Sequence, residues 1–401
     1  MLKYLRTYCI VTISLAQLFG TSLWFSANSA AFDLMHEWNI NISDIGLLTN
    51  AVQTGFILGT LLIALLGIAD RYKASVIFSY SALFGGLFNL CFAWLASNIY
   101  EALIFRFFVG VSLAGIYPIG MKLMIEWAPE KAGQALSVLV AMLTLGTALP
   151  YAFTAISTDL PWRYIISTST FLAFFAGILI FSLGDRPRLQ GERKLKKASP
   201  FVHFSAFKIP RFQAAAIGYF GHMWELYTFW TLVPLIIVQT QINEHFKNFN
   251  LAILAFMVIS VGALGCIFGG IVTKYVHSRM IALSALALSG FSCLMFALGW
   301  KILPTWVLFS ILIVWGTSVV ADSPQFSALS AQACRPEQLG SALALQNSIG
   351  FLLTIVSIGI STYAFDHIGV NAVWIMLIGP IIGIMGYLKF DQKTLNTSRK
   401  L

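Results

Sequence analysis

The sequence predicts an all-α membrane protein whose twelve transmembrane helices form two related six-helix bundles. Its composition is the first reason: of 401 residues, 58% are hydrophobic and only 10% are charged, against about 25% charged residues in soluble domains. Twelve apolar stretches of about 20 residues are the second reason, because a helix of that length crosses a hydrocarbon core of roughly 30 Å. An internal repeat, described below, is the third.

The apolar stretches give the expected positions of the helices. They lie at residues 8–31, 44–68, 75–96, 101–126, 133–157, 162–184, 212–239, 250–273, 280–300, 304–332, 340–364 and 369–389. The first stretch has a second interpretation as a signal peptide, because Lys3 and Arg6 precede it and the small residues of "SANSAAF" end it. The apolar core of a signal peptide usually has about 7–15 residues, and this run is longer. We therefore expect the first stretch to be retained as a helix.

The distribution of basic residues predicts the orientation of the chain in the membrane. With the N-terminus in the cytoplasm, 21 of the 25 Lys and Arg residues lie at cytoplasmic loops, tails or helix ends; Arg163, Lys247 and Lys301 lie outside, and Arg106 lies within the membrane. Cytoplasmic loops carry an excess of Lys and Arg, so we expect a multi-pass protein of the cell inner membrane with both termini in the cytoplasm. Contact with the anionic headgroups of the lipid bilayer accounts for the net charge of +9, and no nucleic-acid partner is expected.

An internal repeat divides the chain into two halves. The phrase "PEKAGQAL" at 129–136 returns as "PEQLGSAL" at 336–343, and identities continue upstream at an offset of 206, as in Gly110 with Gly316. Such self-similarity indicates a duplication. We expect an N-terminal six-helix bundle at 1–184, a basic cytoplasmic linker at 185–211, and a C-terminal six-helix bundle with a short cytoplasmic tail at 212–401.

Two motifs, together with the division into halves, resemble the major facilitator superfamily. The stretch "ADRYK" at 69–73 is similar to the family's loop between the second and third helices, although Leu66 and Lys73 stand where that loop has glycines. The stretch "RFFVGVSLAG" at 106–115 is similar to the R-x-x-x-G-x-x-x-A pattern of the family's fourth helix. The resemblance, which extends to poorly characterised bacterial members, covers almost the whole chain. It implies a secondary transporter whose two bundles rock about a site near the midplane of the membrane.

Four charged residues at the predicted cytoplasmic face are candidates for gating. The resemblance implies that Asp70 and Arg71 form part of a latch between the halves, and a solvated charged turn is the alternative. Glu130 and Glu337 begin the two copies of the repeated phrase, where each would cap the following helix. We expect these two glutamates to meet basic loop residues when the inner gate closes.

Ionisable residues inside the expected helices are the main candidates for chemistry, because placing one at the bilayer centre costs at least about 2.5–3.5 kcal/mol. They are Arg106, His222, Glu225 and Asp322, and the resemblance implies that their helices line the central cavity. Glu225 is the first candidate for proton coupling or solute contact, since apolar surroundings favour the protonated form of a carboxyl group; a structural role is the alternative. His222, three residues away and expected on the same helical face, could relay protons, contact the solute or simply pack.

Asp322 has two interpretations that the sequence leaves open. With Gln325, which shares roughly its helical face, it could bind a polar group of the solute, or it could pair with Arg106 across the two halves in one conformation. Arg106 could also contact the solute or form hydrogen bonds within its own half. Further candidates for the solute site are Trp24, Asn28, Tyr117, Trp224 and Tyr227. Such groups orient ligands in apolar pockets, although polar side chains also join helices in lipid.

The expected function is secondary active transport of a small organic solute by alternating access, with protons as the coupling ion and a monomer as the working unit. The sequence has no G-x-x-x-x-G-K-[ST] loop, which favours an ion gradient over ATP hydrolysis. Its five cysteines and six histidines lack the spacing of a metal site or of a nucleophile with its base, so no enzyme activity, metal or cofactor is expected. A membrane sensor or scaffold of the same fold is the alternative. Import of a nutrient or metabolite and export of a drug or siderophore both remain open.

Overall fold

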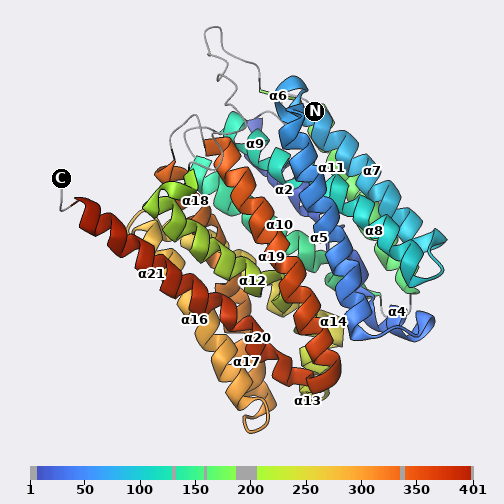
Figure 1. Cartoon of the computed structure of the whole chain (residues 1–401). Coiled ribbons are helices and arrows are strands. Elements are labelled where there is room, and N and C mark those ends of the chain that lie inside the picture. The colour runs from blue at the N-terminus through green and yellow to red at the C-terminus, as the bar shows by residue number, and fades with distance from the viewer. Residues whose placement is uncertain (1–6, 129–131, 158–159, 187–205, 335–338, 399–401) are drawn as a thin grey trace.

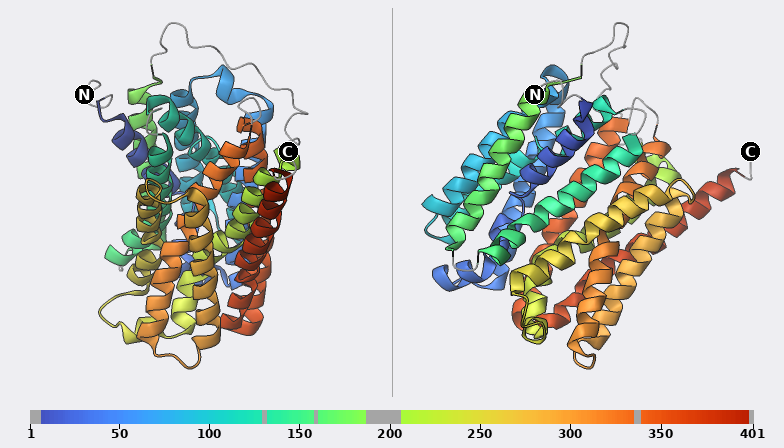
Figure 2. Two further views of the ribbon diagram at one scale, coloured as in Figure 1. Left: turned by 90° about the vertical axis from the view of Figure 1, so that its left-hand side faces the viewer. Right: turned by 180° about the vertical axis from the view of Figure 1, so that it is seen from behind.

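The protein is described by a computed structural model that covers the chain except residues 1–6, 129–131, 158–159, 187–205, 335–338 and 399–401. The described residues form helices and no strands. Nine helical segments among them are long and apolar enough to span a membrane, and the last of these, at residues 342–392, holds two of the expected helices. The prediction of an all-α polytopic protein with two six-helix bundles is confirmed, and the bundles lie side by side in the views of Figures 1 and 2.

The first bundle and its short connecting helices run from the N-terminus to Leu183. They are α2 (Cys9–Thr21), α3 (Ser26–Ser29), α4 (Ala31–Trp38), α5 (Ile42–Leu65), α6 (Ile68–Arg71), α7 (Ala74–Leu95), α8 (Ile99–Leu113), α9 (Tyr117–Trp127), α10 (Ala132–Ile156) and α11 (Trp162–Leu183).

The second bundle begins at Pro210. It contains α12 (Pro210–Gln239), α13 (Ile242–His245), α14 (Leu251–Ser260), α15 (Gly262–Val272), α16 (Ser278–Gly299), α17 (Thr305–Ala321), α18 (Ser323–Ala333), α19 (Leu339–Ile368), the 3₁₀ turn η3 (Gly369–Ala372), α20 (Val373–Met376) and α21 (Ile378–Ser398). The start of α12, α9 and α18 lie at the end of the molecule that we call the linker end, and α4 and α13 lie at the opposite, far end (Figure 1).

Several of the expected helices are interrupted, which the apolar pattern does not predict. The tenth is divided into α17 and α18 at Asp322, next to Pro324 in the first turn of α18. Proline has no N–H and cannot donate to the carbonyl four residues earlier. Here that carbonyl belongs to Val320, and the thiol of Cys266 lies 3.5 Å from its oxygen as a weak donor. The fourth helix is divided in the same way ahead of Pro118, into α8 and α9.

The packing of the two bundles repeats along with the sequence. A Cβ atom added to Gly110 on α8 would lie 2.0 Å from the carbonyl oxygen of Val52 on α5. A Cβ atom added to Gly316 on α17 would lie 2.0 Å from the carbonyl oxygen of Val258 on α14. Gly316 stands 206 residues after Gly110, and Val258 stands 206 residues after Val52, so the second contact repeats the first. Glycine allows the close approach of helix backbones that stabilises membrane bundles. The duplication inferred from the sequence is therefore also visible in the helix contacts.

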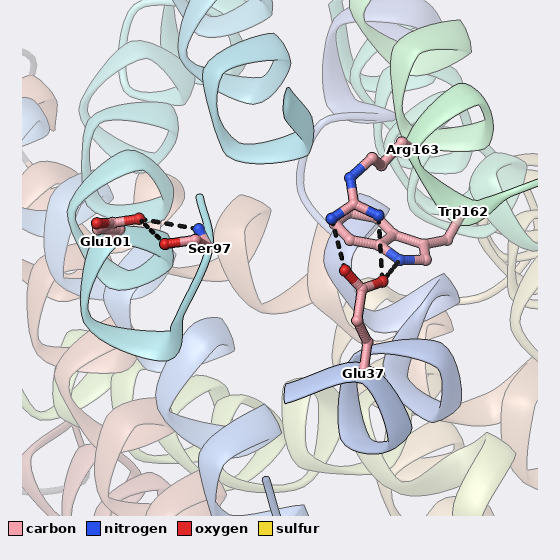
Figure 3. Close-up of polar contacts among 5 residues, drawn as sticks. All are labelled: Glu37, Ser97, Glu101, Trp162 and Arg163. Carbon is pink, nitrogen blue, oxygen red and sulfur yellow. Dashed lines mark hydrogen bonds and ion pairs between the residues drawn. The ribbon is translucent and has the colours of Figure 1, made fainter. Parts of the chain in front are cut away.

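Charged side chains at the far end attach the short helix α4 to the first bundle (Figure 3). Glu37 on α4 accepts hydrogen bonds from both terminal nitrogens of Arg163, at 3.1 and 2.6 Å, and from Trp162 Nε1 at 2.7 Å. The hydrogen bond and the charge of Arg163 lower the pKa of Glu37, with a contribution from Trp162. Figure 3 also shows Glu101, which accepts hydrogen bonds from the backbone N–H and the hydroxyl group of Ser97 at 2.8 and 2.9 Å.

Candidate functional site

A small cavity lies between the two bundles. Its walls come from α9, α10, α12, α17, α18 and α19, and its volume of about 20 Å³ is enough for one water molecule. The residues that line it are Tyr117, Val140, Leu143, Tyr219, His222, Met223, Leu226, Tyr227, Trp230, Val320, Ser323 and Phe351. Because both halves supply walls, a rocking motion of one bundle against the other would open this space.

A buried acid–base pair stands at the edge of the cavity. Nδ1 of His222 on α12 lies 2.7 Å from Oδ1 of Asp322, and both side chains are fully buried. Asp322 occupies the break between α17 and α18, and its neighbour Ser323 lines the cavity together with the ring of His222. Nε2 of His222 and Oδ2 of Asp322 have no side-chain hydrogen-bond partner among the described residues. This pair therefore places two ionisable side chains in contact next to a space between the halves.

Glu225 occupies a different environment from His222. Its carboxylate accepts a hydrogen bond of 2.6 Å from the Ser289 hydroxyl on α16 and one of 2.7 Å from Trp315 Nε1 on α17. Glu225 is fully buried within the second bundle and does not line the cavity. Of the two residues that were expected to share a functional face, His222 lines the cavity and Glu225 points to Ser289 and Trp315 instead. Proton coupling by Glu225 stays a prediction, and its observed contacts are those of the structural alternative.

Arg106 is bound entirely within the first bundle. One terminal nitrogen donates to the Leu23 carbonyl at 3.1 Å, to Ser26 Oγ at 3.0 Å and to Asn89 Oδ1 at 3.1 Å, and the other donates to the Trp24 carbonyl at 2.5 Å. These carbonyls belong to the interruption between α2 and α3, where the helical pattern of hydrogen bonds is lost. Arg106 thus satisfies freed backbone groups of the first helix. It does not pair with Asp322, which the structure places beside His222 instead.

An aromatic cluster joins the halves beside the cavity. The ring of Trp24 lies 5.6 Å from that of Tyr227 and 5.8 Å from that of Phe351, and Phe25 meets Trp230 edge-on at 5.8 Å between ring centroids. Trp24 Nε1 donates to Gln53 at 3.2 Å within the first bundle. Of these two predicted site residues, Tyr227 lines the cavity, and Trp24 packs against it from behind.

Three other predicted site residues lie away from the cavity. Asn28 on α3 donates to the Thr49 hydroxyl at 2.9 Å, and Trp224 donates from Nε1 to the Ile375 carbonyl at 2.9 Å. Gln325 is buried near α15, where its Nε2 lies 3.9 Å from the place that a Cβ of Gly269 would take. Tyr117, by contrast, lines the cavity, and solute binding by it stays a prediction. In this conformation, Asn28 and Trp224 join helices within their own bundles.

The predicted gating residues lie at the linker end or outside the described part of the chain. Asp70 belongs to α6, but its side chain is not described; Arg71 ends α6 and is exposed. Glu130 and Glu337 fall outside the described residues. Beside α6, the Lys122 ammonium donates to the Ala69 carbonyl and lies 3.9 Å from the Glu126 carboxylate.

Sequence reasoning missed several residues of the cavity wall, including Tyr219, Trp230 and Phe351. Two signals could have found the first two. The cavity face of α12 consists of residues 219, 222, 223, 226, 227 and 230, which is the spacing of one helical stripe. Trp230 also stands 206 residues after Trp24, the offset of the internal repeat. Phe351 has no comparable signal, because it stands in a helix that is apolar around most of its circumference.

The two halves are joined at the far end by a carboxylate that caps a helix. Oδ1 and Oδ2 of Asp366, near the end of α19, accept hydrogen bonds from the backbone N–H groups of Ile42 and Ser43 at 3.1 and 2.8 Å, and the Ser43 hydroxyl also donates. These N–H groups begin α5 in the other bundle, where the helix dipole favours a negative charge. Asn250 donates across the halves to the Ala155 carbonyl at 2.8 Å. These bonds therefore join the two bundles at the far end.

We expect Asp366→Asn to open the far end more often, because the neutral amide loses the charge-assisted bonds to the start of α5. The loss of a carboxylate at a helix N-terminus, about 0.3–1 kcal/mol, corresponds to a two- to five-fold rise in opening. The measurement is the rate at which a membrane-impermeant thiol reagent, added to intact cells, labels a Ser323→Cys reporter in a chain whose five native cysteines are replaced. Asp44→Asn is the control, since Asp44 accepts only from Asn41 in its own bundle among the bonds described. Equal labelling in both variants would contradict the latch.

Comparison with known proteins places this architecture among transporters. The sequence model of the Major Facilitator Superfamily matches residues 13–358. A stretch of 98 residues is 30% identical to the 4-hydroxybenzoate transporter PcaK of Pseudomonas aeruginosa; it covers 24% of this chain and about a fifth, 21%, of that protein's length.

Two solved structures show the same fold at low sequence identity. A bacterial homolog of the human lysosomal transporter Spinster, in an inward-facing and unoccupied conformation, has a TM-score of 0.75 and 14% identity over 98% of both chains. A variant of the nucleoside transporter NupG has a TM-score of 0.71 and 12% identity over 96% of this chain and 99% of its own. Because the family match extends over most of both bundles, the chain belongs to the Major Facilitator Superfamily of membrane transporters.

Proposed function

We propose that this chain is a proton-coupled secondary transporter of a small organic solute, in which His222 carries the proton and Asp322 is its counter-charge. The observation that supports this most directly is the 2.7 Å contact between two fully buried ionisable side chains beside the cavity between the halves. Ionisable groups inside a membrane are costly and mark proton or solute pathways. In this chain the two groups also come from different helices, one of which is interrupted at Asp322.

Alternating access supplies the proposed cycle. The bundles rock about the cavity, and the latch of Asp366 on α5 holds the far end closed in this conformation. When that end opens, the solute and the proton exchange with the other side of the membrane. We place the protein in the inner membrane with both termini and the linker at residues 185–211 on the cytoplasmic side, because 21 of 25 Lys and Arg residues then lie on that side. Residues 1–184 and 212–401 are taken as the two moving bodies of a monomer.

The solute is proposed to be a compact ring-bearing molecule. The cavity has five aromatic side chains in its wall, and flat rings pack well against such walls. The solutes named for two similar transporters point the same way, since 4-hydroxybenzoate and nucleosides both contain rings. The first probes therefore keep one ring and vary its substituent.

The test uses proteoliposomes and three radiolabelled phenols: tyramine, 4-hydroxybenzyl alcohol and 4-hydroxybenzoate. Wild type is expected to exchange at least one of them in counterflow and to move it against its gradient when a pH difference is imposed. His222→Gln is expected to keep the counterflow and to lose at least about ten-fold of the pH-driven movement, because glutamine preserves a polar side chain but cannot carry the proton.

Glu225→Gln is the matched comparison, because it neutralises the other deep ionisable side chain of α12. We expect it to retain pH-driven movement. If Glu225→Gln abolishes that movement while His222→Gln retains it, the coupling role belongs to Glu225 and the present assignment is wrong. If wild type exchanges none of the three phenols, transport of this solute class is wrong and the sensor interpretation gains support.

A further inference from the structure

We propose that the solute carries a positive charge: the structure assigns the central cavity to a small aromatic cation whose ammonium group replaces His222 as the partner of Asp322. This inference rests on the proposed function and names the chemical class of the solute. Its starting point is the wall of the cavity. Five rings face it from both halves, those of Tyr117, Tyr219, Tyr227, Trp230 and Phe351.

The second step concerns charge. Among the described residues that line the cavity there is no Lys or Arg, and His222 is the one side chain that can become positive. Arg106, the deep cation of the first bundle, does not line the cavity, and both terminal nitrogens of its guanidinium group already donate within that bundle. An anionic solute would therefore find no free basic side chain in the described wall and would stand near the carboxylate of Asp322.

The third step concerns the carboxylate itself. Asp322 is fully buried, and its neighbour Ser323 and the ring of its partner His222 reach the cavity. Oδ1 of Asp322 faces His222, whereas Oδ2 has no side-chain hydrogen-bond donor among the described residues, so it can accept from a donor on the solute. A buried carboxylate is costly unless paired. A protonated amine on the solute supplies such a pair, and rotation of the His222 ring would give it access.

The fourth step concerns the rest of the ligand. Electron-rich faces of Trp and Tyr rings attract cations, most strongly where water is excluded. Trp230 presents its ring to the cavity, and its N–H has no partner among the described residues. It can donate to a hydroxyl or ether oxygen on the solute. The complete pattern is a flat ring with an amine at one end and an acceptor at the other.

The three phenols of the transport assay differ mainly in charge, so they also test this inference. Each is competed, unlabelled, against counterflow of the labelled phenol that exchanges fastest, which gives relative affinities. Tyramine is expected to bind at least ten-fold more tightly than 4-hydroxybenzyl alcohol, and 4-hydroxybenzoate is expected to compete least. Asp322→Asn is expected to reduce the affinity for tyramine at least ten-fold and to change that for the alcohol less than two-fold. Trp230→Phe, which keeps a ring and removes the donor, should weaken both phenols by a similar factor.

The control variant is Phe171→Leu, which removes an aromatic ring that is 64% exposed on the outside of α11, and it is expected to leave all affinities unchanged. A wild-type preference for the carboxylate or the alcohol, or an Asp322→Asn variant with unchanged selectivity, would overturn the assignment of a cation. Such results would leave the proposed proton-coupled function standing, because that function depends on the behaviour of His222→Gln. Failure of all three phenols to bind would overturn the aromatic-cation class itself.

Discussion

Replacement of Arg106 by methionine is expected to destabilise the protein by on the order of 2–4 kcal/mol. The guanidinium group makes four hydrogen bonds inside the first bundle, and two of them end on carbonyls of the interruption between α2 and α3. Without the guanidinium group the Trp24 carbonyl has no described side-chain donor, and an unsatisfied polar group in a buried position costs about 1–3 kcal/mol. The loss of the bonds to Ser26 and Asn89 adds to this cost.

The measurement is the midpoint of thermal unfolding in detergent, followed by tryptophan fluorescence. Arg163→Met is the matched control, because it removes an arginine with partly exposed ion-pair contacts to Glu37, and such pairs contribute about 0–1 kcal/mol. Arg106→Lys should fall between wild type and Arg106→Met, since lysine keeps the charge but cannot reproduce the planar fork. An Arg106→Met midpoint equal to that of the control would show that Arg106 does not hold the interrupted first helix.

Substitution of Gly265 by alanine is expected to destabilise the second bundle by about 1–3 kcal/mol. A Cβ atom at this position of α15 would lie 2.1 Å from the carbonyl oxygen of Thr317 on α17, so the two helices would have to separate. Gly269, one turn later on the same helix, offers a close control. Its Cβ atom would find its nearest neighbour, the Ala321 carbonyl oxygen, at 3.5 Å, which is an ordinary contact.

Gly269→Ala is therefore expected to be neutral or to gain up to about 1 kcal/mol from the higher helix propensity of alanine. The two variants are compared by thermal unfolding and by the fraction of protein that elutes as a single species in detergent. If both alanines lower the midpoint equally, helix propensity and lipid contact, rather than the approach of α15 to α17, would govern the effect. If neither does, the backbone contact is not close in the protein.

The sequence is informative about the architecture because membrane insertion imposes a simple rule on it. Apolar stretches indicate the helices, and the repeated phrase indicates two halves before any contact is known. Interruptions such as the one at Asp322 are harder to predict. The backbone groups that an interruption frees need donors from other helices, and apolar periodicity does not reveal those donors. At the interruption between α2 and α3, for example, Arg106 of α8 donates to the Leu23 and Trp24 carbonyls.

The candidate site could be predicted residue by residue but not as a set of contacts. Arg106, His222, Glu225 and Asp322 stand out in the sequence because each is an ionisable group in an apolar stretch. Their partners come from helices that are distant in sequence, so the pairing of His222 with Asp322, and of Glu225 with Ser289 and Trp315, follows only from the packing of the second bundle.

The most direct test of the account is a measurement of proton flux. Proteoliposomes that contain the pH-sensitive dye pyranine are mixed with the phenol that shows counterflow, and the internal pH is recorded at once. Wild type is predicted to change the internal pH when the solute is added, and His222→Gln is predicted to exchange the solute without that change. Solute movement by wild type with no change in internal pH, or an undiminished pH change in His222→Gln, would contradict proton coupling through the His222–Asp322 pair.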